Sequence, residues 1–263
     1  MTTISIKPKL LDTFCKAGGC TKGYQMAGFE VVGIDIEPQP RYIGDDFVQM
    51  DALEALRILI AGGYIVGKSG RRWYLSDFLA IHASPPCQIH CEMTKGRWKD
   101  HLKNHVNLIP EVRYLLIASG KPYVIENVEG ARKELINPLL LCGTMFGLQA
   151  RNDAQLWRHR LFECSPAIWF PPASCYHKKQ PAIGVYGGGQ HPLRKNRRRK
   201  NAVIGVYGST DPQSSRDGKS FYGIDDRKIA MGIDWMTGKE LNQAIPPKFT
   251  EYIGQRLMEV LLA

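Results

Sequence analysis

The amino-acid sequence predicts an α/β protein whose main domain is a doubly wound, mostly parallel sheet and whose second domain is a small β-rich insert. Three observations predict this class. Strand-like and helix-like segments alternate up to about residue 165, short β-like runs with proline, glycine and serine follow, and helical spacing returns at about residue 227. Because strands that alternate with helices form parallel sheets covered on both faces, we expect domains at 1–164 and 165–226, with 227–263 completing the first.

The first strands and helix are expected between residues 8 and 51. The apolar run LLDTF predicts a strand, the glycine turn KAGG follows, and a helix is expected from about Thr21 to Ala27, where Gly28 ends it. EVVGID then predicts a second strand that ends at Asp35, and a third short element ends at Asp51. Strand, helix and strand in this order form a βαβ unit.

The alternation continues through the rest of the main domain. We expect a helix over 52–61, a loop or hairpin at GGYIVGKSGRR, and a buried strand LAIHAS that ends at Pro85. Residues 108–119 have helical spacing, and Gly120 with Pro122 ends this helix before the strand YVIEN. Each helix is thus followed by a strand.

The insert contains the pentapeptide IGVYG twice, at 183–187 and 204–208. Two copies are too few for a repeat array, so we expect a pair of similar strands or a hairpin, with the basic segment RKNRRRK between them. Helical pattern then returns in DDRKIAMGIDWM and in FTEYIGQRLMEVLLA, on either side of AIPP. The chain is therefore expected to return to the main domain.

The composition is that of a globular protein with a basic surface. Among 263 residues, 44% are hydrophobic and 23% charged, and no apolar run reaches the roughly 18 residues of a membrane span. No signal-peptide stretch opens the chain, so we expect a soluble protein of the cytoplasm. Lysine and arginine total 35 against 25 aspartates and glutamates, and the net charge of +10 favours a polyanionic partner such as nucleic acid.

A glycine turn and an acidic strand end form the first motif with chemical meaning. The turn runs from Asp12 to Gly19, and Asp35 ends the next strand. Glycines let backbone approach a ligand, and a carboxylate at the second strand end can accept hydrogen bonds from ribose hydroxyls. The pattern favours a nucleotide or adenosyl ligand, although such a turn is often only a turn. The absent GxGxxG disfavours a dinucleotide.

The second motif is ASPPCQ, which follows a buried strand. Prolines fix the loop that presents Cys87 at the end of a strand, where ligands of open α/β sheets bind. The thiol is either a nucleophile or a small buried hydrophobe. His82, His90 and Cys91 lie nearby in sequence, but their spacing matches no usual zinc pattern, so we expect no metal. Seven cysteines without CxxC spacing also argue against a disulfide framework.

The third and fourth motifs are ENV and RHRLFE. Glu126 ends the strand YVIEN, where burial would raise its pKa and make it a general acid; its alternative role is a cap. Arg158 and Arg160 alternate in an extended segment, so both are expected on one side. Two parallel guanidinium groups suit a phosphate or a carbonyl oxygen, and otherwise they are surface cations.

The order of these motifs resembles that of the cytosine-5 DNA methyltransferase family, specifically its compact phage-type members. The likeness covers roughly 10–165 and 227–258, and NQAIPP at 242–247 looks like the family's GNAVPP. Glu126 lies 39 positions after Cys87 (126 minus 87), and PPCQ followed by ENV at this interval is a specific pairing. The resemblance implies the S-adenosylmethionine-dependent methyltransferase fold, with 1–164 as catalytic and cofactor-binding domain and 165–226 as target-recognition domain.

The resemblance also implies roles for individual residues. Cys87 would be the nucleophile, Glu126 would protonate cytosine nitrogen 3, Asn127 would buttress the site, Arg160 would hold the ring oxygen, and Arg158 would shape the pocket. S-adenosylmethionine would contact Asp12, Phe14, Cys15, Ala17, Gly18, Gly19, Asp35, Ile36, Asp51, Ala52 and Pro85. Double-stranded DNA would contact Gln88, Arg194, Lys195, Arg197, Arg198, Arg199 and Lys200, the last six by tracking phosphates.

Lys16 departs from the family pattern, because a glycine usually stands at this place of the cofactor loop. This departure motivates one alternative to a DNA methyltransferase, a catalytically inactive, DNA-binding relative. A second alternative is an enzyme that acts on RNA or uses another one-carbon donor, because the same thiol chemistry serves these reactions. We expect a monomer, in the cytoplasm of a bacterial host or encoded by a phage.

Overall fold

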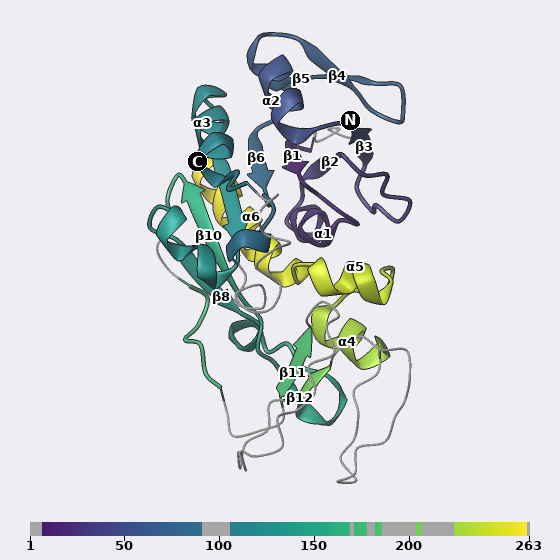
Figure 1. Cartoon of the computed structure of the whole chain (residues 1–263), viewed down its shortest axis with the longest axis vertical. Coiled ribbons are helices and arrows are strands. Elements are labelled where there is room, and N and C mark those ends of the chain that lie inside the picture. Colours follow the sequence, from purple (N-terminus) through teal and green to yellow (C-terminus); the bar gives the residue numbers. More distant parts are fainter. Residues whose placement is uncertain are drawn as a thin grey trace, which may run out of the picture.

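A seven-stranded sheet forms the centre of the molecule (Figure 1). The computed structural model describes residues 7–90, 106–168, 171–177, 182–185, 204–206 and 224–261. The strand order is β3-β2-β1-β6-β7-β10-β8, and β10 runs antiparallel to both of its neighbours while the other pairs are parallel. The strands are β1 (Lys9–Thr13), β2 (Glu30–Asp35), β3 (Asp46–Gln49), β6 (Ala80–Ala83), β7 (Tyr123–Asn127), β8 (Leu139–Cys142) and β10 (His159–Ser165).

Helices cover both faces of this sheet, which confirms the predicted fold class. Alternate strand residues point to opposite faces, so Leu11 packs in one core with α2 (Ala52–Ile60) and α3 (Ile109–Ala118). Its neighbour Leu10 packs in the other core with α1 (Gly19–Met26) and α6 (Pro247–Leu261). The result is a three-layer α/β/α arrangement.

The segment GGYIVGKSGRR forms a hairpin rather than an open loop. Strands β4 (Tyr64–Val66) and β5 (Arg72–Tyr74) pair antiparallel. The Asp46 carboxylate anchors the hairpin to β3, because its Oδ2 accepts hydrogen bonds from Trp73 Nε1 at 2.8 Å and from Ser69 Oγ at 2.6 Å. Short 3-10 helices complete the described connections: η1 (Leu75–Asp77), η2 (Gln88–His90), η5 (Glu129–Glu134), η6 (Gly143–Phe146) and η7 (Arg151–Asp153).

A second sheet of three short strands lies toward one end of the long axis (Figure 1). Strand β11 (Ala182–Val185) pairs with β12 (Ile204–Val206) and with β9 (Gln155–Leu156), both in parallel. The described IGV parts of the two IGVYG copies therefore lie side by side in register, with Ile183 opposite Ile204. They form the expected pair of similar strands; the hairpin alternative is wrong, because a hairpin pairs its strands antiparallel.

The return segment joins the two sheets through a third core. Helix α4 (Ile224–Met231) ends before Gly232, whose φ is +66°, and α5 (Gly238–Gln243) follows. Met231 and Leu241 pack with Leu156 of the small sheet and with Ala17 of the glycine turn. Helix α5 was not predicted from the sequence, although Thr237 and Glu240 form the capping box that marks its start.

The expected elements of the main domain lie within a few residues of those observed. Strand β8 was not predicted, because its apolar residues fall in one short run without alternation. In the part of the chain that the structure describes, no helix has both the length and the apolar character needed to cross a bilayer.

Candidate active site

The loops that carry the sequence motifs leave the large sheet from one edge. Strands β1, β6 and β7 are neighbours and run parallel, so the chain leaves each of them on the same side. Strand β10 runs the opposite way and begins there, with Leu161 opposite Asn127. The Ser84 amide donates to the Thr13 carbonyl oxygen at 3.2 Å, which joins the first two loops directly.

The glycine turn after β1 is wound tightly and contains three left-handed residues. Phe14, Lys16 and Gly18 have φ values of 60°, 47° and 87°. A Cβ added at Gly19 would lie 2.6 Å from the Ile245 carbonyl oxygen, so glycine is needed for this close approach to the AIPP segment. Lys16 also has a positive φ, at a steric cost that a glycine would avoid.

Asp12 is a buried carboxyl group at the mouth of this turn. Its Oδ2 accepts a hydrogen bond of 2.6 Å from Thr21 Oγ1, while its Oδ1 is buried without a hydrogen-bond partner among the described residues. Burial raises its pKa to about 7, and the Thr21 hydrogen bond opposes this rise. A polar ligand donor at Oδ1 would satisfy the orphaned atom.

Asp35 receives contacts from the glycine turn itself. Its Oδ2 accepts from the Lys16 amide at 3.0 Å, and its Oδ1 accepts from the Glu37 amide at 3.0 Å. The Lys16 ammonium also lies 3.4 Å from Oδ1. The carboxylate that would hold ribose hydroxyls is thus oriented by backbone and paired with a cation. Beside it, Ile36 is 62% exposed and offers an apolar surface.

Asp51 is the N-cap of α2. Its Oδ1 accepts from the amides of Leu53 at 2.9 Å and Glu54 at 3.0 Å, which is the usual role of aspartate at a helix start. Ala52 is buried beneath it. The structure therefore gives Asp51 a capping function in addition to the adenine contact that the resemblance implies.

The PPCQ loop is held from both sides. Pro85 is buried, and its carbonyl oxygen accepts a 3.0 Å hydrogen bond from Asn127 Nδ2 at the end of β7. Beyond it, the Cys87 carbonyl oxygen accepts from the His90 amide at 2.9 Å. The Cys87 residue is half-buried, and Gln88 is exposed. Asn127 thus ties the end of β7 to the loop that carries Cys87.

Glu126 and Arg160 face each other across β7 and β10. Glu126 is buried, and the Arg160 Nε lies 3.1 Å from its Oε1 in an ion pair that lacks hydrogen-bond alignment. Burial raises the pKa of Glu126, while Arg160, the Ser84 hydroxyl and Arg158 oppose the rise. A carboxyl with a raised pKa keeps its proton to higher pH, as a general acid requires.

Arg158 and Arg160 do not act as two parallel groups on one ligand, which corrects that expectation. Arg158 is 4% exposed, and its Nη2 donates to the Asn242 carbonyl oxygen at 3.1 Å and the Ala244 carbonyl oxygen at 2.6 Å. It therefore fixes the NQAIPP segment against the site. Arg160 instead donates to the His159 carbonyl oxygen at 2.7 Å and pairs with Glu126.

The sequence analysis missed a buried polar chain that leads to Glu126. Tyr24 Oη and His82 Nδ1 lie 2.9 Å apart, His82 Nε2 and Ser84 Oγ lie 2.8 Å apart, and the Ser84 side chain is close enough to lower the pKa of Glu126. Burial lowers the pKa of His82 to about 3, so the imidazole is neutral at ordinary pH. The polar His82 inside the apolar strand LAIHAS was the available signal.

The remaining predicted site residues fall into two groups. Phe14, Cys15, Ala17 and Gly18 lie in the turn between β1 and α1, next to Asp12 and Asp35. The basic positions expected to contact DNA lie outside the described residues, as does Cys91. These basic positions are Arg194, Lys195, Arg197, Arg198, Arg199 and Lys200.

Comparisons with known proteins show which fold this is. No protein-family model matches the chain, and no curated protein matches it in sequence. Among solved structures, a putative DNA modification methyltransferase from an E. coli prophage has a TM-score of 0.53 at 14% identity, covering 97% of this chain and 100% of that one. The chain has the methyltransferase fold.

Two further neighbours agree. The Dnmt2 methyltransferase of S. pombe has a TM-score of 0.52 at 13% identity, with 97% of this chain and 99% of that chain covered. The Entamoeba histolytica methyltransferase EhMeth has a TM-score of 0.53 at 13% identity, with the same coverage. The methyltransferase resemblance of the motifs and the structural likeness therefore point the same way.

The residues of the glycine turn fit a nucleoside ligand that carries a cationic group. The orphaned Oδ1 of Asp12 can accept from an ammonium group, and Asp35 and Ile36 offer a carboxylate and an apolar surface for a nucleoside. The Lys16 ammonium, 3.4 Å from Asp35, opposes a cationic ligand. The fit is therefore good at Asp12 and weakened by charge at Asp35.

Proposed function

We propose that this protein transfers a methyl group from S-adenosylmethionine to carbon 5 of a cytosine in double-stranded DNA, through a transient covalent bond to Cys87. One observation carries the proposal: Cys87 follows β6, Glu126 lies at the end of β7 and Arg160 at the start of β10, so the three come together at one sheet edge beside the glycine turn. The fold that the chain shares with methyltransferases supports it.

Cys87 would act first, as the nucleophile. Carbon 5 of cytosine reacts poorly, so the Cys87 thiolate adds to carbon 6, a C–S bond forms, and the electrons of the C5–C6 double bond move into the ring. Carbon 5 then becomes the nucleophilic carbon of an enamine. Asn127 supports this step by holding the Pro85 carbonyl, and with it the loop that presents the thiol.

Glu126 and Arg160 would make the addition easier. Glu126 gives its proton to ring nitrogen 3 as the thiolate adds, and Arg160 donates to the carbonyl oxygen at ring position 2, where negative charge develops. These two ring positions are neighbours, as are the two side chains, whose Nε and Oε1 atoms lie 3.1 Å apart. The raised pKa of Glu126 suits the proton donor.

Asp12, Asp35 and Ile36 would hold the methyl donor, with Asp12 facing its amino group and the other two its nucleoside. When bound, S-adenosylmethionine supplies an electrophilic methyl group on a sulfonium. After carbon 5 is methylated, a base removes its proton, the C–S bond breaks and Cys87 leaves as thiolate. Glu126 then regains the proton from nitrogen 3, so the residues return to their starting state.

The target base must leave the duplex to reach Cys87. Base flipping costs a few kcal/mol, and contacts between basic residues and phosphates can offset it. The net charge of +10 and the basic segment at 194–200 support a polyanionic substrate. Gln88 is exposed directly beside the nucleophile, where it can contact the DNA around the extruded base.

The test is transfer of a labelled methyl group from S-adenosylmethionine to duplex DNA, run beside tRNA. We expect cytosine in DNA to be labelled, Cys87→Ala to reduce transfer to background, and the matched control Cys164→Ala to retain it. Transfer to tRNA alone would show that the substrate is RNA. A product with the mass of hydroxymethylcytosine would show that the enzyme uses a different one-carbon donor. If wild type and Cys87→Ala are equally inactive on varied DNA, the proposed methyltransferase activity is refuted.

Lys16 favours a second candidate, a DNA-binding relative that no longer binds the cofactor. Its ammonium lies 3.4 Å from the Asp35 carboxylate, which the nucleoside would need as a hydrogen-bond acceptor. Titration calorimetry with S-adenosylhomocysteine separates the two candidates. Saturable binding rejects the inactive relative, whereas DNA binding without any affinity for S-adenosylhomocysteine rejects the methyltransferase.

A further inference from the structure

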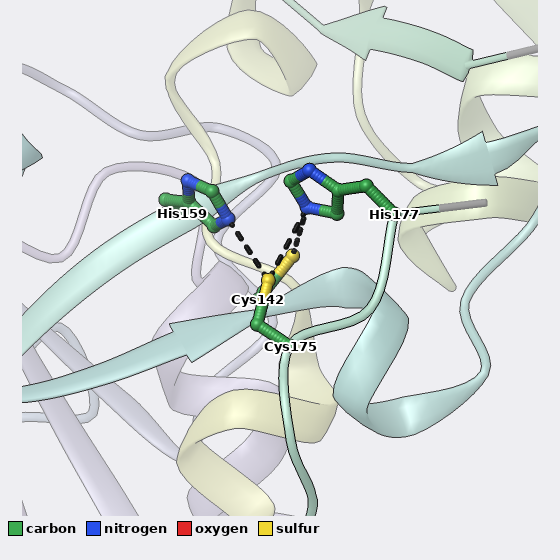
Figure 2. Close-up of side chains that lie close together, drawn as sticks. All are labelled: Cys142, His159, Cys175 and His177. Atoms are coloured by element: carbon green, nitrogen blue, oxygen red, sulfur yellow. Dashed lines mark hydrogen bonds between the residues drawn. The ribbon is translucent and has the colours of Figure 1, made fainter. Parts of the chain in front are cut away.

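Two cysteines and two histidines converge at the outer end of the same sheet edge (Figure 2). Cys142 ends β8, and His159 begins the neighbouring strand β10, where the two residues are paired in register. Cys175 and His177 come from the segment 171–177, which follows β10 in the chain. Figure 2 shows both imidazole rings turned toward the two sulfur atoms.

The distances among the four ligand atoms are those of a metal site that is almost assembled. One nitrogen or sulfur from each residue lies within 4.8 Å of all the others. His177 Nε2 lies 3.4 Å from Cys142 Sγ and 3.3 Å from Cys175 Sγ, and His159 Nε2 lies 3.4 Å from Cys175 Sγ. Sulfur and nitrogen ligands of a tetrahedral zinc ion are separated by about 3.6 Å, given bonds of about 2.3 and 2.1 Å.

The surrounding side chains are arranged as metal ligands usually require. The Nδ1 of His159, on the far side of the ring from the sulfurs, lies 3.0 Å from the Glu129 carboxylate. Such a carboxylate fixes the tautomer that leaves Nε2 free to bind a metal. The Thr144 hydroxyl donates to Cys142 Sγ at 3.3 Å, as expected for a thiolate held in place. Trp157 stacks on His177 with ring centroids 4.3 Å apart.

We propose that Cys142, His159, Cys175 and His177 bind a structural zinc ion. Two thiolates and two imidazoles are a preferred set for Zn²⁺, and four protein ligands close the coordination sphere, which is the mark of a structural rather than a catalytic site. This proposal replaces the expectation of no metal, which considered only His82, Cys87, His90 and Cys91. Only Cys175 and His177 lie close together in sequence, so the four ligands form no recognisable sequence motif.

The zinc ion would tie the segment 171–177 to the end of the large sheet. Each residue of this segment is exposed, so packing alone holds it weakly. The ion would also fix His159, whose carbonyl oxygen accepts a 2.7 Å hydrogen bond from Arg160. A metal bound here thus holds both the segment 171–177, which precedes β11 of the small sheet, and the position of Arg160.

Metal content is the first test, and it needs neither DNA nor methyl donor. The full chain, produced with zinc and freed of any polyhistidine tag, should contain about one zinc ion per molecule. The double variant Cys175→Ser/His177→Asn should lose it, while Cys164→Ser, which removes a thiol outside the cluster, should keep it. Co²⁺ added to the metal-free chain should give the absorption of tetrahedral thiolate coordination in wild type and Cys164→Ser only.

A milder variant keeps all four ligands in case the double variant does not fold. Glu129→Gln should weaken zinc binding by about ten-fold or more, because it removes the carboxylate behind His159. A folded wild type without zinc or Co²⁺ binding would overturn the proposal, as would equal metal content in wild type and double variant. A mass two hydrogens lower, with Cys142 joined to Cys175, would show a disulfide and also overturn it.

Discussion

Two sites lie along the edge of the large sheet where its parallel strands end, and they are built in different ways. We call the site around Cys87 and Glu126 the inner end and the cluster of Cys142, His159, Cys175 and His177 the outer end. At the inner end, Glu126 is buried at the end of β7, and a buried hydrogen bond from Asn127 to Pro85 ties this strand to the loop that carries Cys87. At the outer end, exposed Cys175 and His177 come to β8 and β10 from a segment without a core of its own. The inner site is organised by packing, whereas the outer cluster needs a bound ion to organise it.

The two ends should therefore respond to different perturbations. Changes to buried polar groups should alter the chemistry at the inner end and leave metal content unchanged. Removing the metal should loosen the outer end first and reach the inner end only through His159 and Arg160.

Glu126→Gln should lower kcat for methyl transfer by roughly 10²–10⁴-fold, because the amide cannot donate the proton that nitrogen 3 requires. Zinc content should stay that of wild type, because Glu126 does not contact the cluster. Steady-state kinetics and metal analysis of the same preparation check both statements. A loss of kcat below about three-fold would contradict the role of Glu126 as proton donor. A parallel loss of zinc would contradict the separation of the two ends.

Asp12→Asn should change how stability depends on pH. Burial raises the pKa of Asp12 from 3.8 to about 7, so the folded state keeps its proton after the unfolded state has lost it. Stability from this group is therefore present at low pH and is lost as pH rises from about 4 to 7, by at most about 4 kcal/mol.

Urea unfolding of wild type and Asp12→Asn across this pH range measures the effect. The stability of the variant relative to wild type should rise with pH up to about 7 and then level off. A difference that is constant with pH would mean that Asp12 does not titrate in this window.

Asn127→Ala should destabilise the protein by roughly 1–3 kcal/mol, because the buried Pro85 carbonyl loses its side-chain donor. It should also reduce methyl transfer, since the loop that carries Cys87 loses its support. Unfolding and transfer are measured on one sample, and zinc content serves as the internal control. Reduced stability with undiminished transfer would limit Asn127 to a structural role.

Lys16→Gly should tighten S-adenosylmethionine binding by up to about five-fold, the range of an exposed ion pair. The change removes a cation 3.4 Å from Asp35 and suits the φ of 47°. S-adenosylhomocysteine, which lacks the sulfonium charge, should gain less. Calorimetry of both ligands, with Lys22→Ala as the charge-matched control, checks this; equal gains would assign the effect to contact rather than charge.

Local patterns were sufficient to predict the inner end. Its residues follow strands directly, and in a parallel sheet successive strand ends meet at one edge, so Asp12, Cys87 and Glu126 could be placed together from their order alone. The resemblance to methyltransferases added the roles. What the sequence did not reveal is the chain Tyr24–His82–Ser84, because its hydrogen bonds join elements that only the folded sheet brings together.

The outer end could not be predicted because its geometry depends on strand order. Cys142 meets His159 only because β8 and β10 pair at the far side of the sheet, and β8 itself was missed. The parallel pairing of β11 with β12 was not predicted for a similar reason, since two strands of similar sequence can pair either parallel or antiparallel. Both features depend on contacts between distant parts of the chain.

Trapping with DNA that contains 5-fluorocytosine tests the central claim most directly. Fluorine at carbon 5 blocks the final proton removal, so the bond to carbon 6 cannot break. We expect a stable complex that forms only with S-adenosylmethionine present, with the modified base on the peptide that contains Cys87. A complex that persists in Cys87→Ala, or none in a wild type that binds both ligands, would contradict the account.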